Sequence, residues 1–390
     1  MEFGLFFEIS VPRPWGPESE HRVYKECIDQ VELADRLGFD QVWVVEHHFL
    51  EEHSHVSAPD LFLMACAGRT QQIRLGHGIV VCVPQLNHPV RLAERAATLD
   101  ILSDGRLEFG TGRATSWTEL SGYGANPDET KKTWDEFVRV IPQMWTQEKF
   151  GYNGRSFSMP KRPILPKPYQ KPHPPMWVAV TSPGTEIDAA ERGLGGLFLS
   201  FSGVAQQEKR VAEYRRRIQT CKPVGKFVNN QVSLVNFLYC HEDDDHGSAL
   251  GRKLAATYTY ISGQVLSVRE VYPTPSYPTS TPQSRARVEL ERKGPDEPKV
   301  PEGLCVGNPE RVIEALKKWE AIGVDRVNFL LNVVDLVPQE AVLASMRLFA
   351  REVMPHFTKR PATEAAFEDG TNSATGHAQP VAAQAQSVEV

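Results

Sequence analysis

Eight short apolar segments, separated by longer amphipathic ones, restrict the fold of this chain more than any other feature. The short segments are rich in β-branched residues and have the length of strands, whereas the longer ones carry apolar residues at helical spacing. Strands that alternate with helices form parallel sheets, and this number of units favours a closed barrel. We therefore predict an α/β fold, a (β/α)8 TIM barrel with insertions, as a single domain of residues 1–357. The predicted strands are 2–9, 41–45, 74–81, 106–110, 176–180, 196–200, 228–238 and 326–331, and the predicted helices include 25–37, 92–102, 128–145, 206–219 and 309–322.

Two regions do not follow the alternation of strands and helices. Residues 272–303 are rich in proline, serine and charge, and a segment this long inside a compact domain is usually functional or disordered. We predict that it forms a mobile lid over the barrel. Residues 358–390 are polar and alanine-rich, with little to bury, so we predict a disordered C-terminal tail.

Composition and charge exclude several classes of protein. The net charge is −6, so no general basic surface exists for nucleic acid or for anionic lipid. No apolar run is long enough for a transmembrane helix, and the N-terminus lacks the basic segment of a signal peptide. The six cysteines are too scattered for a zinc motif or a redox pair. We expect a cytoplasmic protein with reduced thiols.

The first candidate site is the run Glu46-His47-His48 at the end of the second predicted strand, where a barrel carries its reactive groups. Adjacent histidines point to opposite sides of an extended backbone, and no zinc-binding frame such as HExxH accompanies them. An acid–base or substrate-orienting role is our prediction, because the pKa of histidine lies close to neutral pH. A structural role and a metal-ligand role are the alternatives.

Two further clusters have the composition of anion-binding turns. Gly110-Thr-Gly-Arg113 ends the fourth predicted strand, and Lys131 follows in the next predicted helix. Glycines allow a ligand close to the backbone, and arginine grips a phosphate with two donors. The segment from Thr181 to Thr185 supplies hydroxyl groups before a helix, as phosphate sites do. An ordinary tight turn and an ordinary helix cap would use the same residues.

Four segments, taken in order, resemble the bacterial-luciferase-like monooxygenases, and the similarity is spread over about residues 1–355. The run from 38 to 49 resembles the second-strand signature of that family, and the run from 87 to 113 resembles its third helix and fourth strand. The other two resemble the fifth βα unit and the last helix–strand pair. These segments read GFDQVWVVEHHF (38–49), NHPVRLAERAATLDILSDGRLEFGTGR (87–113), VAVTSPGTEIDAAERGL (178–194) and VGNPERVIEALKKWEAIGVDRVNFLL (306–331).

The resemblance implies a TIM barrel that holds reduced FMN at its C-terminal face. His47 falls on the position treated as catalytic in luciferases, with Glu46 and His48 beside it. Gly112 replaces the reactive cysteine of the light-emitting branch, so aldehyde-dependent light emission is not implied. The positions implied to bind the flavin and its phosphate are Arg113, Lys131, Ser182 and Thr185, with Gly110 and Thr181 as further cofactor contacts.

The same resemblance implies oxygen chemistry. Reduced FMN and O₂ form a flavin C4a-hydroperoxide, which oxygenates a small organic substrate, and the flavin carries the hard chemistry. A separate flavin reductase is the expected partner, because the chain has no nicotinamide-binding fingerprint. We also expect a homodimer. The alternatives are an oxidoreductase that transfers hydride with the deazaflavin F420, a non-catalytic flavin-binding protein, and a metal-dependent barrel hydrolase.

Overall fold

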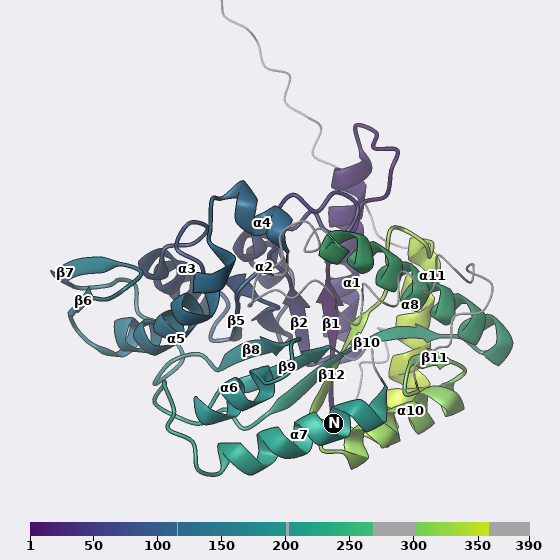
Figure 1. The fold of residues 1–390 in the computed structure, drawn as a ribbon. Coiled ribbons are helices and arrows are strands. Elements are labelled where there is room, and N and C mark those ends of the chain that lie inside the picture. The colour runs from purple at the N-terminus through teal and green to yellow at the C-terminus, as the bar shows by residue number, and fades with distance from the viewer. Residues whose placement is uncertain (115, 200–202, 268–301, 359–390) are drawn as a thin grey trace, which may run out of the picture.

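Eight parallel strands close into a barrel in the computed structural model, which describes residues 1–114, 116–199, 203–267 and 302–358. Each strand pairs with the next, and β12 returns to pair with β1, so the ring has no open edge. Figure 1 shows the strands at the centre with the helices around them. The predicted (β/α)8 barrel is confirmed. Its strands are β1 (Glu2–Phe7), β2 (Gln41–Val44), β3 (Arg74–His77), β5 (Leu107–Gly112), β8 (Met176–Val180), β9 (Gly195–Leu199), β10 (Val232–Cys240) and β12 (Arg326–Leu330).

The helices form the outer layer and bury their apolar stripes against the barrel. α1 ends where Gly38 adopts φ 85°, a left-handed conformation that suits glycine. α10 begins with Asn308, whose side chain caps the Arg311 N–H, and with Pro309 in the first turn. These helices are α1 (Ser19–Leu37), α2 (Pro59–Ala67), α3 (Pro89–Leu102), α4 (Trp117–Gly122), α5 (Thr130–Thr146), α6 (Thr185–Glu191), α7 (Val204–Ile218), α8 (Asp244–Ser267), α10 (Pro309–Ala321) and α11 (Gln339–Leu348), with short turns η1 (Pro127–Glu129), η3 (Phe349–Val353) and η4 (Met354–His356).

Several boundaries differ from the sequence-based expectation. The expected strand 74–81 is two strands, because β4 (Val80–Val81) pairs with β5 and not with β2. The hairpin of β6 (Phe150–Asn153) and β7 (Ser158–Arg162) and the added strand β11 (Cys305–Gly307) were not predicted. Nor were α2, α4 and α11. The predicted lid, apart from residues 302–303, and the predicted tail after residue 358 lie outside the described residues.

The barrel interior is filled by side chains. Trp43 and Trp177 are fully buried and meet edge to face at 5.4 Å between ring centroids, so Trp43 packs the core and does not line an open pocket. At the N-terminal end of the barrel, Glu108 accepts hydrogen bonds from Arg74, Trp177 and Arg326. The charges at this end are paired with one another and stabilise the barrel. The reactive groups of such a barrel are expected at the opposite end, where the strands have their carboxyl ends.

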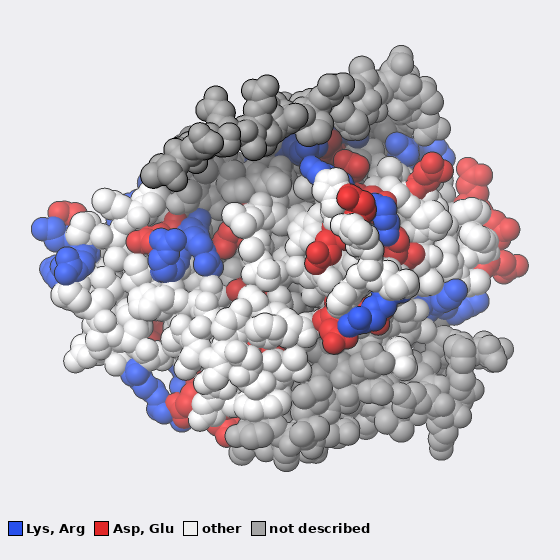
Figure 2. Space-filling model, turned by 90° about the horizontal axis from the view of Figure 1, so that it is seen from above, with Lys and Arg blue, Asp and Glu red and all other residues white. Residues whose placement is uncertain are grey.

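The surface and the cysteines agree with a globular enzyme. Figure 2 shows acidic and basic side chains interspersed on one face, without a field of a single sign. All six cysteines are free, and five of them are buried. Within the described residues, no helix is both long enough and apolar enough to span a bilayer.

Candidate active site

His47 lies between two carboxylates at the carboxyl end of the barrel. Its Nδ1 is 2.8 Å from Glu119 Oε1, and its Nε2 is 3.5 Å from Glu8 Oε2. Glu8 directly follows β1, His47 follows β2, and Glu119 belongs to α4. The three groups come from separate parts of the chain, and only closure of the barrel brings them together. We call Glu8, His47, His53 and Glu119 the reactive cluster.

Glu119 fixes the orientation of the His47 ring. The Glu119 side chain is fully buried, and its Oε2 accepts hydrogen bonds from the Ser116 N–H and hydroxyl, each at 3.0 Å. The Ser116 hydroxyl in turn caps the Glu119 N–H, which completes a capping box at the start of α4. Sequence reasoning missed Glu119, although the Ser-x-x-Glu pattern of a capping box was present in the sequence.

The carboxylates make His47 basic. Burial alone would lower its pKa, but the charges of Glu119, Glu8 and Glu46 and the hydrogen bond to Glu119 outweigh burial and raise the pKa to about 9. His47 is therefore a protonated imidazolium at neutral pH. Its neighbour His53 behaves in the opposite way, because burial lowers its pKa. The two rings lie 5.5 Å apart.

Glu46 and His48 lie on the other side of the backbone, as expected for neighbours of His47. Glu46 accepts hydrogen bonds from the Val81 N–H at 2.6 Å and from Asn87 Nδ2 at 2.8 Å. His48 Nε2 is 3.3 Å from Glu46, and the His48 Nδ1 is 3.1 Å from the Tyr123 hydroxyl. Glu46 thus ties the end of β2 to β4. The His48 side chain faces away from the reactive cluster, whereas its backbone N–H donates to Glu119 Oε1 at 3.4 Å.

Glu8 was also missed by sequence reasoning. Its Oε1 accepts a 2.9 Å hydrogen bond from the Tyr258 hydroxyl of α8, whereas its buried Oε2 has no hydrogen-bond partner. His53 Nε2 lies 3.7 Å from that oxygen. The following residue, Ile9, has φ 50°, a costly backbone conformation for a β-branched residue.

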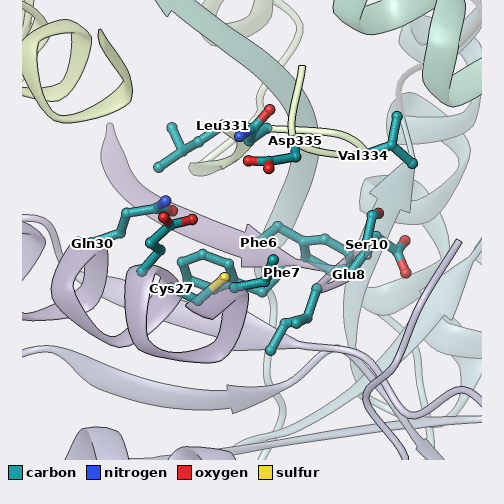
Figure 3. Close-up of a pocket in the computed structure, with 13 residues that line it drawn as sticks. Phe6, Phe7, Glu8, Ser10, Cys27, Gln30, Leu331, Val334 and Asp335 are labelled. Atoms are coloured by element: carbon teal, nitrogen blue, oxygen red, sulfur yellow. The ribbon is translucent and has the colours of Figure 1, made fainter. Parts of the chain in front are cut away.

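Figure 3 shows Glu8 and Ser10 on one side of a small cavity and Cys27 and Gln30 on the other. The cavity lies between β1, α1 and the segment after β12, and it encloses about 30 Å³. That space suits a water molecule, not a flavin. It therefore belongs to the wall behind Glu8 and is not the substrate pocket.

The residues implied to bind phosphate partly come together. Lys131 Nζ of α5 is 2.8 Å from Asp188 of α6, and α6 begins at Thr185, whose N–H donates to the Ser182 carbonyl. We call Lys131, Ser182, Thr185 and Asp188 the phosphate cluster. Thr181 and Ser182 are exposed.

Of the remaining candidates for the cofactor site, Gly110 lies on β5 and Arg113 directly follows that strand. β5 pairs with β8, so Arg113 and Thr181 leave the barrel from neighbouring strands. A Cβ atom at Gly110 would lie 1.9 Å from the His77 carbonyl oxygen. Close packing against β3 already explains this glycine, and a flavin contact from Gly110 stays a prediction.

Fold and site together define a TIM barrel with a buried cluster of titratable groups at the carboxyl ends of its strands. Residues 1–326 match the profile of the family described as luciferase-like monooxygenase. The chain belongs to this family, and it is an oxidoreductase.

Characterised relatives align over nearly the whole chain. The oxygenase component of the flavin-dependent trigonelline monooxygenase of Acinetobacter baylyi is 26% identical, covering 92% of this chain and 96% of that protein. The alkanal monooxygenase alpha chain of Photobacterium leiognathi is 27% identical, covering 87% and 95%. Among solved structures, the monooxygenase RslO1 from Streptomyces bottropensis superimposes with a TM-score of 0.73 at 27% identity, covering 92% of this chain and all of that chain.

Proposed function

We propose that this chain is the oxygenase component of a two-component monooxygenase that uses reduced FMN and O₂ to oxygenate a small organic substrate. The observation that carries the proposal is His47, held by Glu119 and facing Glu8 at the barrel's carboxyl end. The trigonelline relative is named as an oxygenase component, and a structural neighbour, 3,6-diketocamphane monooxygenase, contains FMN. That neighbour is 17% identical, so its fold alone is compared.

The residues present fit a flavin phosphate. Thr181 and Ser182 offer exposed hydroxyls, and Lys131 offers an exposed ammonium group beside the first turn of α6. We assign the phosphate to Arg113, Lys131, Ser182 and Thr185, with Gly110 and Thr181 beside the flavin. When bound, the flavin supplies the chemistry of oxygen activation.

The protein's own contribution is a proton held in position in a buried site. His47 is protonated at neutral pH, and with Nδ1 engaged by Glu119 its Nε2–H lies next to Glu8, 3.5 Å from Oε2. A proton held there can be given to a developing negative charge. Glu46 and His48, assigned with His47 in the catalytic set, hold the end of β2 in place.

Partner and location follow from this assignment. Reduced FMN comes from a separate flavin reductase, and we place both proteins in the cytoplasm, in keeping with the free cysteines. We also propose a homodimer, which light scattering combined with size-exclusion chromatography tests.

The decisive experiment couples the purified protein to a flavin reductase with NADH, FMN and isotopically labelled O₂. The substrate panel contains trigonelline, an alkanal, a camphane diketone and limonene, for which a 24% identical monooxygenase of Rhodococcus erythropolis is named. Mass spectrometry detects label in the product. We expect incorporation with at least one compound, and a loss of about 10²–10⁴-fold in His47→Ala. Full coupled turnover by His47→Ala would falsify the role of His47.

A binding experiment separates the alternatives. Under anaerobic conditions the protein is titrated with reduced FMN and, separately, with reduced F420. Tighter binding of F420 would replace the proposal by hydride transfer. Binding of FMN without product from any of the four compounds, and without accelerated oxidation of the reduced flavin by O₂, would indicate a flavin-binding protein.

A further inference from the structure

Three potential metal ligands converge in the reactive cluster. Within the described residues, Glu8, His47 and His53 form a group in which one ligand atom of each lies within 4.8 Å of the other two. Glu8 Oε2 is at the centre of the group, 3.5 Å from His47 Nε2 and 3.7 Å from His53 Nε2. That oxygen is buried and makes no hydrogen bond. The contact with His47 at 3.5 Å is longer than an ordinary hydrogen bond, and a cation between the three groups would satisfy this oxygen more closely.

These distances suit tetrahedral coordination. Zinc binds imidazole nitrogen and carboxylate oxygen at about 2.0–2.1 Å, which places neighbouring ligands of a tetrahedron about 3.3 Å apart. The two measured separations, 3.5 and 3.7 Å, exceed that value by only a few tenths of an ångström. Small side-chain rotations would close the difference. Three protein ligands leave one position open for water, as in catalytic zinc sites.

The surroundings already support these ligands. His47 Nδ1 is hydrogen-bonded to the buried Glu119 carboxylate, and a metal-binding histidine usually donates its second ring N–H to such a group. The other oxygen of Glu8 is held by Tyr258. Glu8 and Glu119 contribute two negative charges around two histidines, so the local charge favours a divalent cation.

We propose that Glu8, His47 and His53 bind one divalent transition-metal ion, with Zn²⁺ as the representative, and that this ion inhibits the enzyme reversibly. Two imidazoles and one carboxylate favour Zn²⁺, Co²⁺ or Fe²⁺ over Mg²⁺ and Ca²⁺. A bound ion takes the place of the proton on His47 Nε2, which is released to solvent, so His47 cannot donate that proton while the ion is bound. Metal binding itself is independent of the proposed function, whereas the inhibition rests on it.

Isothermal titration calorimetry of the metal-free, full-length protein with ZnCl₂ tests the site. We expect one ion per chain, no comparable binding of Mg²⁺, and at least about tenfold weaker Zn²⁺ binding in His53→Asn. His55→Asn is the matched control, because His55 lies two residues away and pairs with Glu20 outside the group. Circular dichroism of both variants checks that they fold. Glu8→Gln, which keeps its size and can still accept from Tyr258, should weaken Zn²⁺ as His53→Asn does.

The inhibition is measured separately, in single turnovers with chemically reduced FMN, so that zinc cannot act on the reductase. The Zn²⁺ concentration for half inhibition should rise about tenfold in His53→Asn and stay unchanged in His55→Asn. Absence of one-site binding, or equal weakening in both variants, overturns the metal site. One-site binding in a protein that forms no oxygenated product overturns the proposed function while leaving the metal site intact.

Discussion

The reactive cluster and the phosphate cluster are built in contrasting ways. In the reactive cluster the Glu119 side chain is fully buried and the His47 side chain is 11% exposed, and each makes a defined hydrogen bond before any ligand binds. In the phosphate cluster the Lys131 side chain is 58% exposed and pairs with Asp188. The reactive cluster is buried and fixed by the fold, whereas the phosphate cluster is exposed and held by a surface ion pair.

This difference has a physical origin. A carboxylate removed from water must find donors within the protein, so Glu119 is fixed by the Ser116 hydroxyl and N–H together with His47. An exposed ammonium group remains hydrated, and its ion pair contributes little to stability. Precise positioning is needed where a proton moves, whereas a phosphate needs only charge and donors.

A substitution in the reactive cluster should have the largest effect on activity. Glu119→Gln removes the charge that holds and polarises His47, and we expect coupled oxygenation to fall by about 10- to 100-fold. The basic limb of the pH–rate profile should move to lower pH, because the carboxylate is a main cause of the raised His47 pKa. Ser116→Ala, which keeps the carboxylate, is the control. A loss of rate without any shift of the profile would mean that Glu119 only supports folding.

The residues of the reactive cluster differ in how far the sequence could predict their positions. The alternation of strands and helices is local and periodic, so the barrel and the place of His47 could be predicted. Glu8 and Tyr258 are separated by 250 positions and meet through a side-chain hydrogen bond, and no local pattern encodes such a contact. Glu119 is intermediate, because its capping box with Ser116 is a local pattern but its contact with His47 requires the closed barrel.

The buried His47 should make stability depend on pH. Its pKa is about 9 in the folded protein against the ordinary value of 6.5, so its stabilising contribution is full below pH 6.5 and is lost as pH rises through 9. Between pH 6.5 and 7.5, about one unit below the ordinary pKa of thiols exposed by unfolding, titration of His47 should lower the free energy of unfolding by at most about 1.4 kcal/mol per pH unit. The lowered pKa of His53 gives a slope of opposite sign, which fades above pH 6.5 as the unfolded form also loses its proton.

Urea unfolding in the presence of a chelator measures this dependence, and His47→Asn should flatten it. Equal slopes for the wild-type protein and His47→Asn between pH 6.5 and 7.5 would show that the carboxylates do not keep His47 charged. This pH dependence belongs to the reactive cluster, where carboxylates surround His47.

A substitution in the phosphate cluster should have the smallest effect, a modest loss of affinity for FMN. Lys131→Met removes one ammonium group from the phosphate cluster, and because Lys131 is exposed we expect only about three- to tenfold weaker binding of FMN, near 1 kcal/mol. Riboflavin, which lacks the phosphate, should bind both proteins equally. Lys132→Met is the matched control, since Lys132 has similar exposure but pairs with Glu129. Fluorescence titration measures the affinities of the wild-type protein and both variants for the two flavins, and an equal loss for riboflavin would show that Lys131 supports the fold around the flavin instead of contacting the phosphate.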